Sequence, residues 1–170
     1  MSLKKPKEIP GIAKSRNKSI EKTKDQTPHK KISAVEFKCS VYFKTIPASD
    51  VQYYCLVVET VQHFSLLSYE LSLQHRKNKN VIDVSILGLK TKNNYVNEPG
   101  PAYSELMFEE LYGNYTINII KQDGSINSAV FNFNIFKKDI SLVEEFIPEK
   151  ENNRKFCDFL VKKEKFSFTK

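Results

Sequence analysis

The chain of 170 residues has no tryptophan, only five glycines and three histidines, and no long apolar run. A transmembrane helix needs about 18 or more apolar residues in a row, so no membrane-spanning helix is expected. The first thirty residues have no apolar centre, so they do not resemble a signal peptide. The glycines are scattered and form no phosphate-binding turn. His29, His63 and His75 lack metal-ligand spacing, so we expect neither a metal nor another cofactor.

Three cysteines, Cys39, Cys55 and Cys157, cannot all pair within one chain. We expect reduced, buried thiols, with a bridge between Cys39 and Cys55 as the alternative, because both lie on consecutive expected strands. Cys55 stands in an apolar run, where burial raises the pKa of a thiol and makes it a poor nucleophile. The adjacent carboxylate pairs would point to opposite faces of a strand. No catalytic residue is therefore expected, and we interpret the protein as a non-enzyme.

The net charge of +7 is concentrated at the two ends of the chain. Residues 1–31 hold ten basic and three acidic residues, residues 32–149 hold ten and fourteen, and residues 150–170 hold seven and three. The central part is mildly acidic, so nucleic-acid binding by the whole domain is not favoured.

Residues 1–32 have no aromatic residue, few aliphatic ones and three prolines, which predicts a disordered basic segment. It is either a solvated linker or an electrostatic arm that binds nucleic acid or an acidic membrane surface weakly and without sequence preference.

From residue 35 onward the pattern alternates between apolar and polar residues with a period of two, which is typical of strands with one wet face. Residues 35–43 predict one strand, residues 51–75 two more with an indistinct join near His63, and residues 82–86 another. The clearest signal is a β-hairpin over residues 108–135, whose apolar runs flank the turn residues Asp123 and Gly124.

Leu111, Gly113, Tyr115 and Ile117 follow one another at the head of this hairpin as L-x-G-x-Y-x-I. This step resembles the Gly-x-Tyr corner of immunoglobulin-like and fibronectin-type sandwiches, in which the tyrosine hydroxyl bonds back to the upstream backbone. The resemblance covers about thirty residues and implies a fold only, with Gly113 and Tyr115 as a structural corner. Ile117 stands where the antibody-type second cysteine would be. A hairpin in another meander or barrel is the alternative.

Together these patterns predict an all-β protein: an immunoglobulin-like antiparallel β-sandwich of about seven strands over residues 33–136. Residues 137–170 are expected to form a short helical or irregular extension. Within it, Phe156, Phe159 and Leu160 have helical spacing, so residues 150–163 predict a short helix.

The longest irregular segment runs from residue 91 to 103 and contains P-G-P at residues 99–101, which we expect to exclude regular pairing. Long ordered loops are often functional. Tyr95, Asn97, Glu98 and Tyr103 are a candidate ligand-contact surface for a sugar or peptide, but a sheet-to-sheet crossover with incidental tyrosines is the favoured interpretation.

Two functions follow as expectations. The first is a binding or spacer module of an envelope-associated or secreted system that contacts a protein or glycan through a loop or sheet edge. The second is an intracellular adaptor whose basic termini bind nucleic acid or another polyanion. The location is outside the cytoplasm if an export signal has been removed, and cytoplasmic otherwise.

Overall fold

The computed structural model describes residues 35–48, 51–92, 99–151 and 153–168. The expected basic segment over residues 1–32 lies outside them. The strands are β1 (Phe37–Ile46), β2 (Val51–Phe64), β3 (Tyr69–Asn78), β4 (Val81–Thr91), β5 (Gly100–Phe108), β6 (Gly113–Ile120), β7 (Ile126–Asn134), β8 (Asp139–Phe146) and β9 (Cys157–Val161), followed by the 3₁₀ turn η1 (Lys163–Lys165). The all-β class is thus confirmed, and the described part contains no α-helix.

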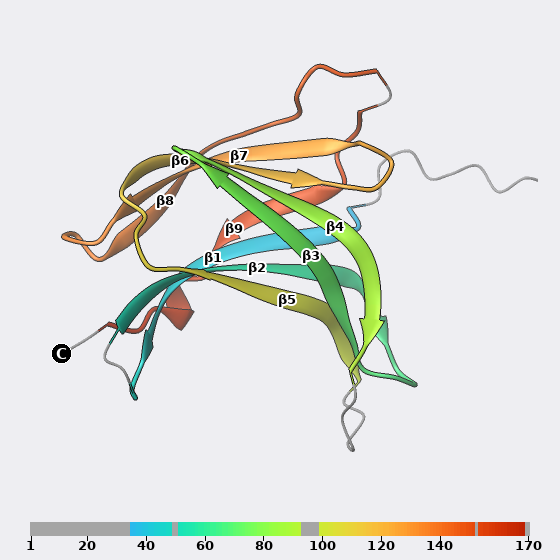
Figure 1. The fold of residues 1–170 in the computed structure, drawn as a ribbon, viewed down its shortest axis with the longest axis horizontal. Coiled ribbons are helices and arrows are strands. Elements are labelled where there is room, and N and C mark those ends of the chain that lie inside the picture. Colours follow the sequence, from blue (N-terminus) through green and yellow to red (C-terminus); the bar gives the residue numbers. More distant parts are fainter. Residues whose placement is uncertain (1–34, 49–50, 93–98, 152, 169–170) are drawn as a thin grey trace, which may run out of the picture. The chain divides into compact units, whose positions relative to one another are not determined.

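The nine strands form one sheet that curls until it is nearly closed into a barrel, so the expected seven-stranded sandwich is not what the fold shows. The strand order is β8-β7-β6-β4-β3-β5-β2-β1-β9. The sheet is mixed rather than antiparallel, because β4 pairs with β6, and β1 with β9, in parallel. Figure 1 shows the long β3–β4 hairpin crossing from the group β6, β7, β8 to the group β5, β2, β1.

Two weak seams complete the barrel, and side chains replace missing backbone hydrogen bonds at both. β3 and β5 share a single parallel pair, and there the Ser104 hydroxyl donates to the Leu71 carbonyl at 2.5 Å. Between β7 and the start of β9, Oδ1 of the buried Asn127 accepts hydrogen bonds from the backbone N–H groups of Phe156 (2.8 Å) and Cys157 (2.9 Å). At this same second seam, between the edge strands β8 and β9, the Glu145 carboxylate accepts a hydrogen bond from the N–H of Phe159 at 3.0 Å. These bonds satisfy strand edges that the sheet leaves open.

The expected hairpin is present as β6 and β7, with Tyr115 opposite Phe131 and Ile117 opposite Ala129. These four inward side chains are buried, as the period of two requires. Gly124 has a φ of +78°, and the Asp123 carboxylate accepts from the N–H of Ser125 at 2.9 Å, so the turn residues act as expected.

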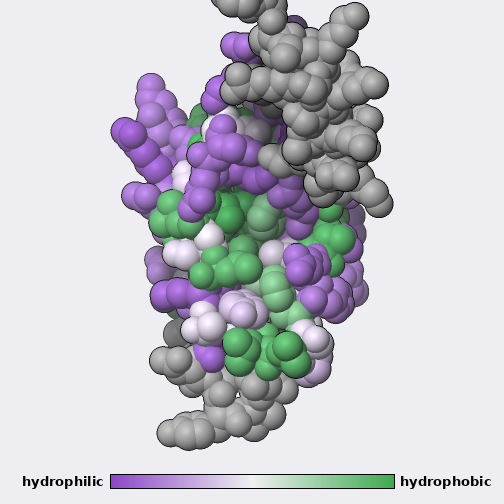
Figure 2. Space-filling model, turned by 90° about the vertical axis from the view of Figure 1, so that its right-hand side faces the viewer, coloured by the Kyte–Doolittle hydropathy of each residue, from purple (hydrophilic) through white to green (hydrophobic). Residues whose placement is uncertain are grey.

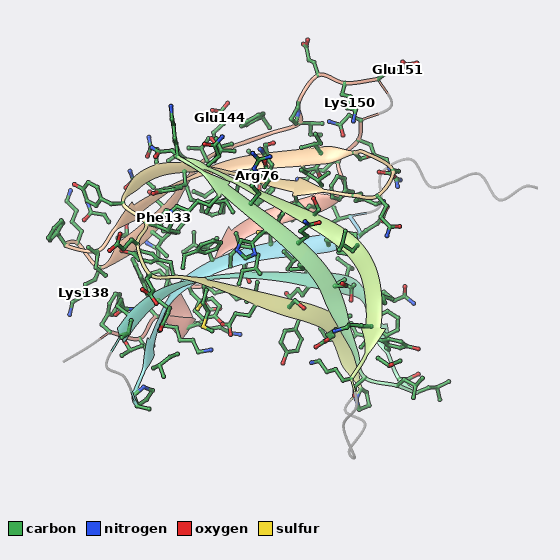
Figure 3. The ribbon with its side chains drawn as sticks, viewed as in Figure 1. Arg76, Phe133, Lys138, Glu144, Lys150 and Glu151 are labelled. Carbon is green, nitrogen blue, oxygen red and sulfur yellow. The ribbon has the colours of Figure 1, made fainter. Side chains whose placement is uncertain are left out.

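The core fills the inside of the barrel with the alternate side chains of the strands. Its largest fully buried members include Phe43, Phe131, Phe133 and Phe156. Figure 3 shows Phe133 between the two groups of strands. A smaller apolar cluster lies on the outer face, where Tyr42, Cys55 and Val57 are buried. The sheet therefore packs on both faces over β1 and β2.

The C-terminal extension departs from the expectation, because it supplies two strands of the sheet instead of a helix. Cys157, Phe159 and Val161 face the core from β9, which follows a period of two. The helical spacing of Phe156, Phe159 and Leu160 was therefore a coincidence of a short segment. Pairing with the open edge of β1 satisfies the backbone over five residues, and a helix would have left that edge unpaired.

Strand β5 begins earlier than expected, because Gly100 and Pro101 pair with Phe64 and His63 of β2. The register shifts between Glu59 and His63, so Pro101 lies beyond an irregularity where proline is tolerated. The join near His63 was also misplaced, since β2 continues to Phe64.

An apolar hollow of about 440 Å³ lies on the face of the sheet where β1 begins and where β2 and β4 end. Phe37, Phe64 and Leu89 are among its walls, and the buried Leu71 and Ile86 also line it. Figure 2 shows hydrophobic side chains gathered in the middle of this face. Among the described residues, no helix is long and apolar enough to cross a membrane.

Candidate binding groove

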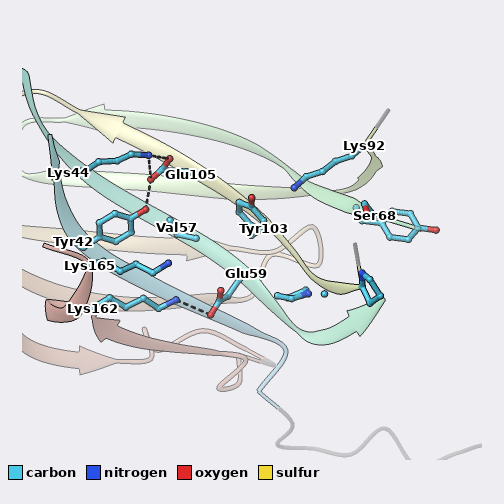
Figure 4. A pocket seen from close by; sticks show the side chains of 14 residues that line it. Tyr42, Lys44, Val57, Glu59, Ser68, Lys92, Tyr103, Glu105, Lys162 and Lys165 are labelled. Atoms are coloured by element: carbon cyan, nitrogen blue, oxygen red, sulfur yellow. Dashed lines mark hydrogen bonds and ion pairs between the residues drawn. The ribbon is translucent and has the colours of Figure 1, made fainter. Parts of the chain in front are cut away.

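A groove of about 560 Å³ lies on the outer face of the sheet, over β1, β2 and β5 (Figure 4). Its lining residues are Tyr42, Lys44, Val57, Glu59, Ser68, Tyr69, Lys92, Pro99, Gly100, Pro101, Tyr103, Glu105, Lys162 and Lys165. We call it the lysine groove. Strand alternation places its central residues on one face, because side chains two residues apart on a strand point the same way. Lys162 and Lys165 are added by the chain that leaves β9.

Glu105 is the centre of a polar network at one end of the lysine groove. Its carboxylate accepts hydrogen bonds from the Tyr42 hydroxyl at 2.5 Å and from Lys44 Nζ at 2.9 Å. Burial acts to raise the pKa of Glu105, but hydrogen bonds from Tyr42, Lys44 and Cys55 outweigh it, so the net pKa lies below its usual 4.5. Burial, followed by the bond to Glu105, raises the pKa of Tyr42. The network therefore holds an ionised carboxylate beside a neutral phenol.

A second ion pair stands further along the same face, between Lys162 Nζ and Glu59 at 3.3 Å. Both side chains are more than three-quarters shielded from solvent. Glu59 lies opposite Tyr103 on β5, so this pair flanks the Tyr103 ring. Figure 4 shows Tyr103 near the middle of the groove, with both dashed networks on one side of it and Lys92 on the other.

The remaining two lysines of the groove lie near aromatic rings. Lys92 Nζ is 4.0 Å from the centre of the Tyr103 ring, and Lys165 Nζ is 5.6 Å from that of Tyr42. Within the described residues neither ammonium group forms an ion pair with a carboxylate. Cation–π contacts at exposed sites contribute about 0.5–1 kcal/mol, so both ammonium groups are weakly held.

The structure brings one of the four expected ligand-contact residues into the groove. Tyr103 is 48% exposed and lies beside the end of the P-G-P segment. Tyr95, Asn97 and Glu98 lie outside the described residues. Sequence reasoning missed Lys162 and Lys165, which join the groove only because β9 pairs with β1.

The expected corner residues lie at the start of β6. Gly113 has a φ of +79°, a conformation that favours glycine. Tyr115 is 8% exposed, and its ring packs edge-on against Phe133 with centroids 5.9 Å apart. Among the described residues its hydroxyl has no hydrogen-bond partner, so the hydroxyl-to-backbone bond of the sandwich corner is not found there.

The three cysteines are free and buried. Cys39 faces the core and Cys55 the outer cluster, so the alternative bridge between them is excluded by their opposite faces. Burial, with help from Glu105, raises the pKa of Cys55 to about 12, which keeps the thiol protonated at neutral pH. No group of three or more His, Cys, Asp or Glu side chains suited to a metal ion occurs in the described ranges.

No family model, no curated protein and no solved structure matches this chain.

Proposed function

We propose that the protein is a non-enzymatic binding module of an envelope-associated or secreted system, and that the lysine groove binds a glycan carrying acidic groups. The observation that carries this proposal is the exposed Tyr103 ring, flanked by the weakly held ammonium group of Lys92 and by the Glu59–Lys162 pair. Aromatic rings provide flat apolar contact surfaces beside polar groups that fix orientation. Lysine attracts the acidic groups of the ligand, while the paired carboxylates accept hydrogen bonds from its hydroxyl groups.

The state of the carboxylates favours binding over hydrolysis. Glycoside hydrolysis uses a carboxylic acid with a raised pKa beside an ionised one. Glu105 has a lowered pKa, and both Glu59 and Glu105 are paired with lysines. This arrangement supports a role in holding hydroxyl groups.

A second candidate is the binding of single-stranded nucleic acid or another polyanion, and the placement of Lys162 and Lys165 favours it. Both belong to the basic C-terminal segment, and tyrosines beside lysines suit base stacking on a charged groove. Glu59 and Glu105 repel phosphates as they repel the acidic groups of a glycan, but a glycan also offers these carboxylates many hydroxyl donors in return.

The test measures binding of three labelled ligands by fluorescence anisotropy at low salt: a uronic-acid oligosaccharide, a neutral oligosaccharide of equal length and a single-stranded DNA of equal charge. We expect the acidic oligosaccharide to bind most tightly. Lys92→Gln and Lys165→Gln should each weaken binding roughly two- to fivefold, as expected for one exposed charge pair.

Lys137→Gln is the matched control, because Lys137 is an exposed lysine outside the groove. Tyr103→Ala should weaken binding of the acidic oligosaccharide at high as well as low salt, because ring contact is not screened. If the DNA binds more tightly than the acidic oligosaccharide, polyanion binding replaces glycan binding as the proposed function. Equal affinities for Lys165→Gln and Lys137→Gln would reject the groove as the site.

A further inference from the structure

A second cavity, of about 590 Å³, opens at the end of the barrel where β3 ends and β6 begins. It is lined by Tyr54 and Tyr115 from the inside of the sheet, and by Tyr112 and Phe136 from the connections before β6 and after β7. We call it the tyrosine cleft. It shares no lining residue with the lysine groove.

The floor of the cleft contains two tyrosines whose rings are buried. Tyr54 is 5% exposed and Tyr115 is 8% exposed, and both rings pack edge-on against Phe133, with centroids 5.5 and 5.9 Å away. Neither hydroxyl has a hydrogen-bond partner within the described part of the chain. Ser40 Oγ is the one buried side-chain polar atom without a partner among the described residues, so both tyrosine hydroxyls are accessible, and at this cavity they can hydrogen-bond a polar group of a ligand.

The wall of the cleft is aromatic and exposed. Tyr112 is 65% exposed and Phe136 84%, and their rings meet edge to face with centroids 6.0 Å apart. Large side chains with this exposure do not stabilise the core. The face of an aromatic ring is negative, so exposed rings at a cavity can attract a cation.

Charges at the cleft favour a cation. Glu109 and Glu110 line it, and among the described residues neither carboxylate forms an ion pair. Lys77 already places an ammonium group there: its Nζ lies 5.5 Å from the centre of the Tyr115 ring and donates to the Glu110 backbone carbonyl at 2.9 Å. The cleft thus accommodates a positive charge, and its lining includes two glutamates and one lysine.

We infer that the tyrosine cleft binds an organic cation, an ammonium or guanidinium group on a short apolar stem. The stem packs against the joined rings of Tyr112 and Phe136, and the cation lies near the aromatic rings and the Glu109 and Glu110 carboxylates. A tyrosine hydroxyl of the floor accepts a hydrogen bond from one of its N–H groups. This chemistry is shared by free alkylamines and by the side chains of lysine and arginine in a peptide. The inference is independent of the lysine groove.

The test titrates the full-length protein with n-butylammonium and n-butylguanidinium, using n-butanol as the neutral analogue, and follows binding by ligand-observed NMR. We expect saturable binding of both cations and none of the alcohol. Tyr112→Ala and Phe136→Ala should each weaken binding roughly three- to tenfold, the range of one cation–π contact. Both side chains are exposed, so the variants should keep the fold. Tyr103→Ala, an exposed tyrosine of the other site, is the matched control and should leave binding unchanged.

Lys77→Met separates a binding role from a structural one, because it removes the resident cation and keeps an apolar stem. We expect this variant to bind n-butylammonium several-fold more tightly. Equal binding of n-butanol, weaker binding by Lys77→Met, or no effect of Phe136→Ala would each overturn the inference. A lysine-containing peptide that binds better than n-butylammonium would assign the site to a partner's side chain, and the reverse would assign it to a free amine.

Discussion

The lysine groove and the tyrosine cleft differ in how their polar groups are satisfied. In the groove, Glu59 and Glu105 each have a lysine partner, and the Tyr42 hydroxyl donates to a carboxylate. In the cleft, the hydroxyls of Tyr54 and Tyr115 have no partner among the described residues. Strand pairing fixes side chains of adjacent strands at contact distance, so polar side chains of the groove form hydrogen bonds and ion pairs with one another. The cleft lies where strands end, and its polar groups line a space that the described residues leave open.

The prediction with the largest expected effect compares a buried residue beneath the cleft with a buried residue beneath the groove. Phe133 is fully buried in the main core beneath the cleft, whereas Val57 belongs to the small outer cluster beneath the groove. Phe133→Ala should reduce the free energy of unfolding by about 3–5 kcal/mol. Val57→Ala removes two methyl groups and should reduce it by roughly 1.5 kcal/mol. Urea denaturation midpoints measure both, and equal losses would show that the groove floor is as integral as the core.

The local elements were predictable from the sequence, but their assembly was not. The β6–β7 hairpin followed from alternation and from Asp123 and Gly124, which are all local signals. The parallel pairs β4–β6 and β1–β9 join segments far apart in the chain, and alternation carries no information about which strands pair. The seam residue Asn127 likewise reads as any polar strand residue until its partners at 156 and 157 are known.

Of the residues that line the lysine groove, the sequence pointed to one as a ligand contact. Tyr103 stood out because an irregular segment with prolines precedes it, and it does line the groove. Lys162 and Lys165 did not stand out, because the spacing of Phe156 and Phe159 suggested a helix that would have placed them elsewhere. The alternative period of two, from Cys157 to Val161, was the available signal.

A smaller effect compares the same substitution in both regions. Tyr42→Phe removes a hydroxyl that donates to the Glu105 carboxylate at 2.5 Å, and it should lower stability by about 1.5–3 kcal/mol, as for hydrogen bonds to charged groups. Tyr115→Phe removes a hydroxyl without a partner among the described residues, so we expect a change below about 0.5 kcal/mol. The corner resemblance predicts a loss of about 0.5–1.5 kcal/mol for the same variant, the value of a typical hydrogen bond. Thermal or urea unfolding of Tyr115→Phe therefore decides between the corner and the open hydroxyl.

The smallest effect is a pH dependence confined to the groove. The folded-state pKa of Glu105 lies below 4.5, so its ionised form stabilises the fold above the unfolded-state value, and this stability is lost as the pH falls through the folded-state pKa. Glu105→Gln should therefore lose more stability at pH 7 than at pH 3. We expect the pH-dependent part to be about 1 kcal/mol or less, because Lys44 is 39% exposed and solvent screens the pair.

Urea midpoints of the wild type and Glu105→Gln at pH 7, 5, 4 and 3 measure this difference at low salt. Lys44→Met should shrink the same pH dependence, since it removes the ammonium group that favours the ionised carboxylate. Lys137→Met, an exposed lysine outside the groove, is its matched control and should follow the wild type. A constant gap between wild type and Glu105→Gln from pH 7 to pH 3 would mean that the carboxylate titrates alike in the folded and unfolded chains. The groove network would then stabilise the fold only through neutral hydrogen bonds, and its contrast with the cleft would be one of packing rather than of charge.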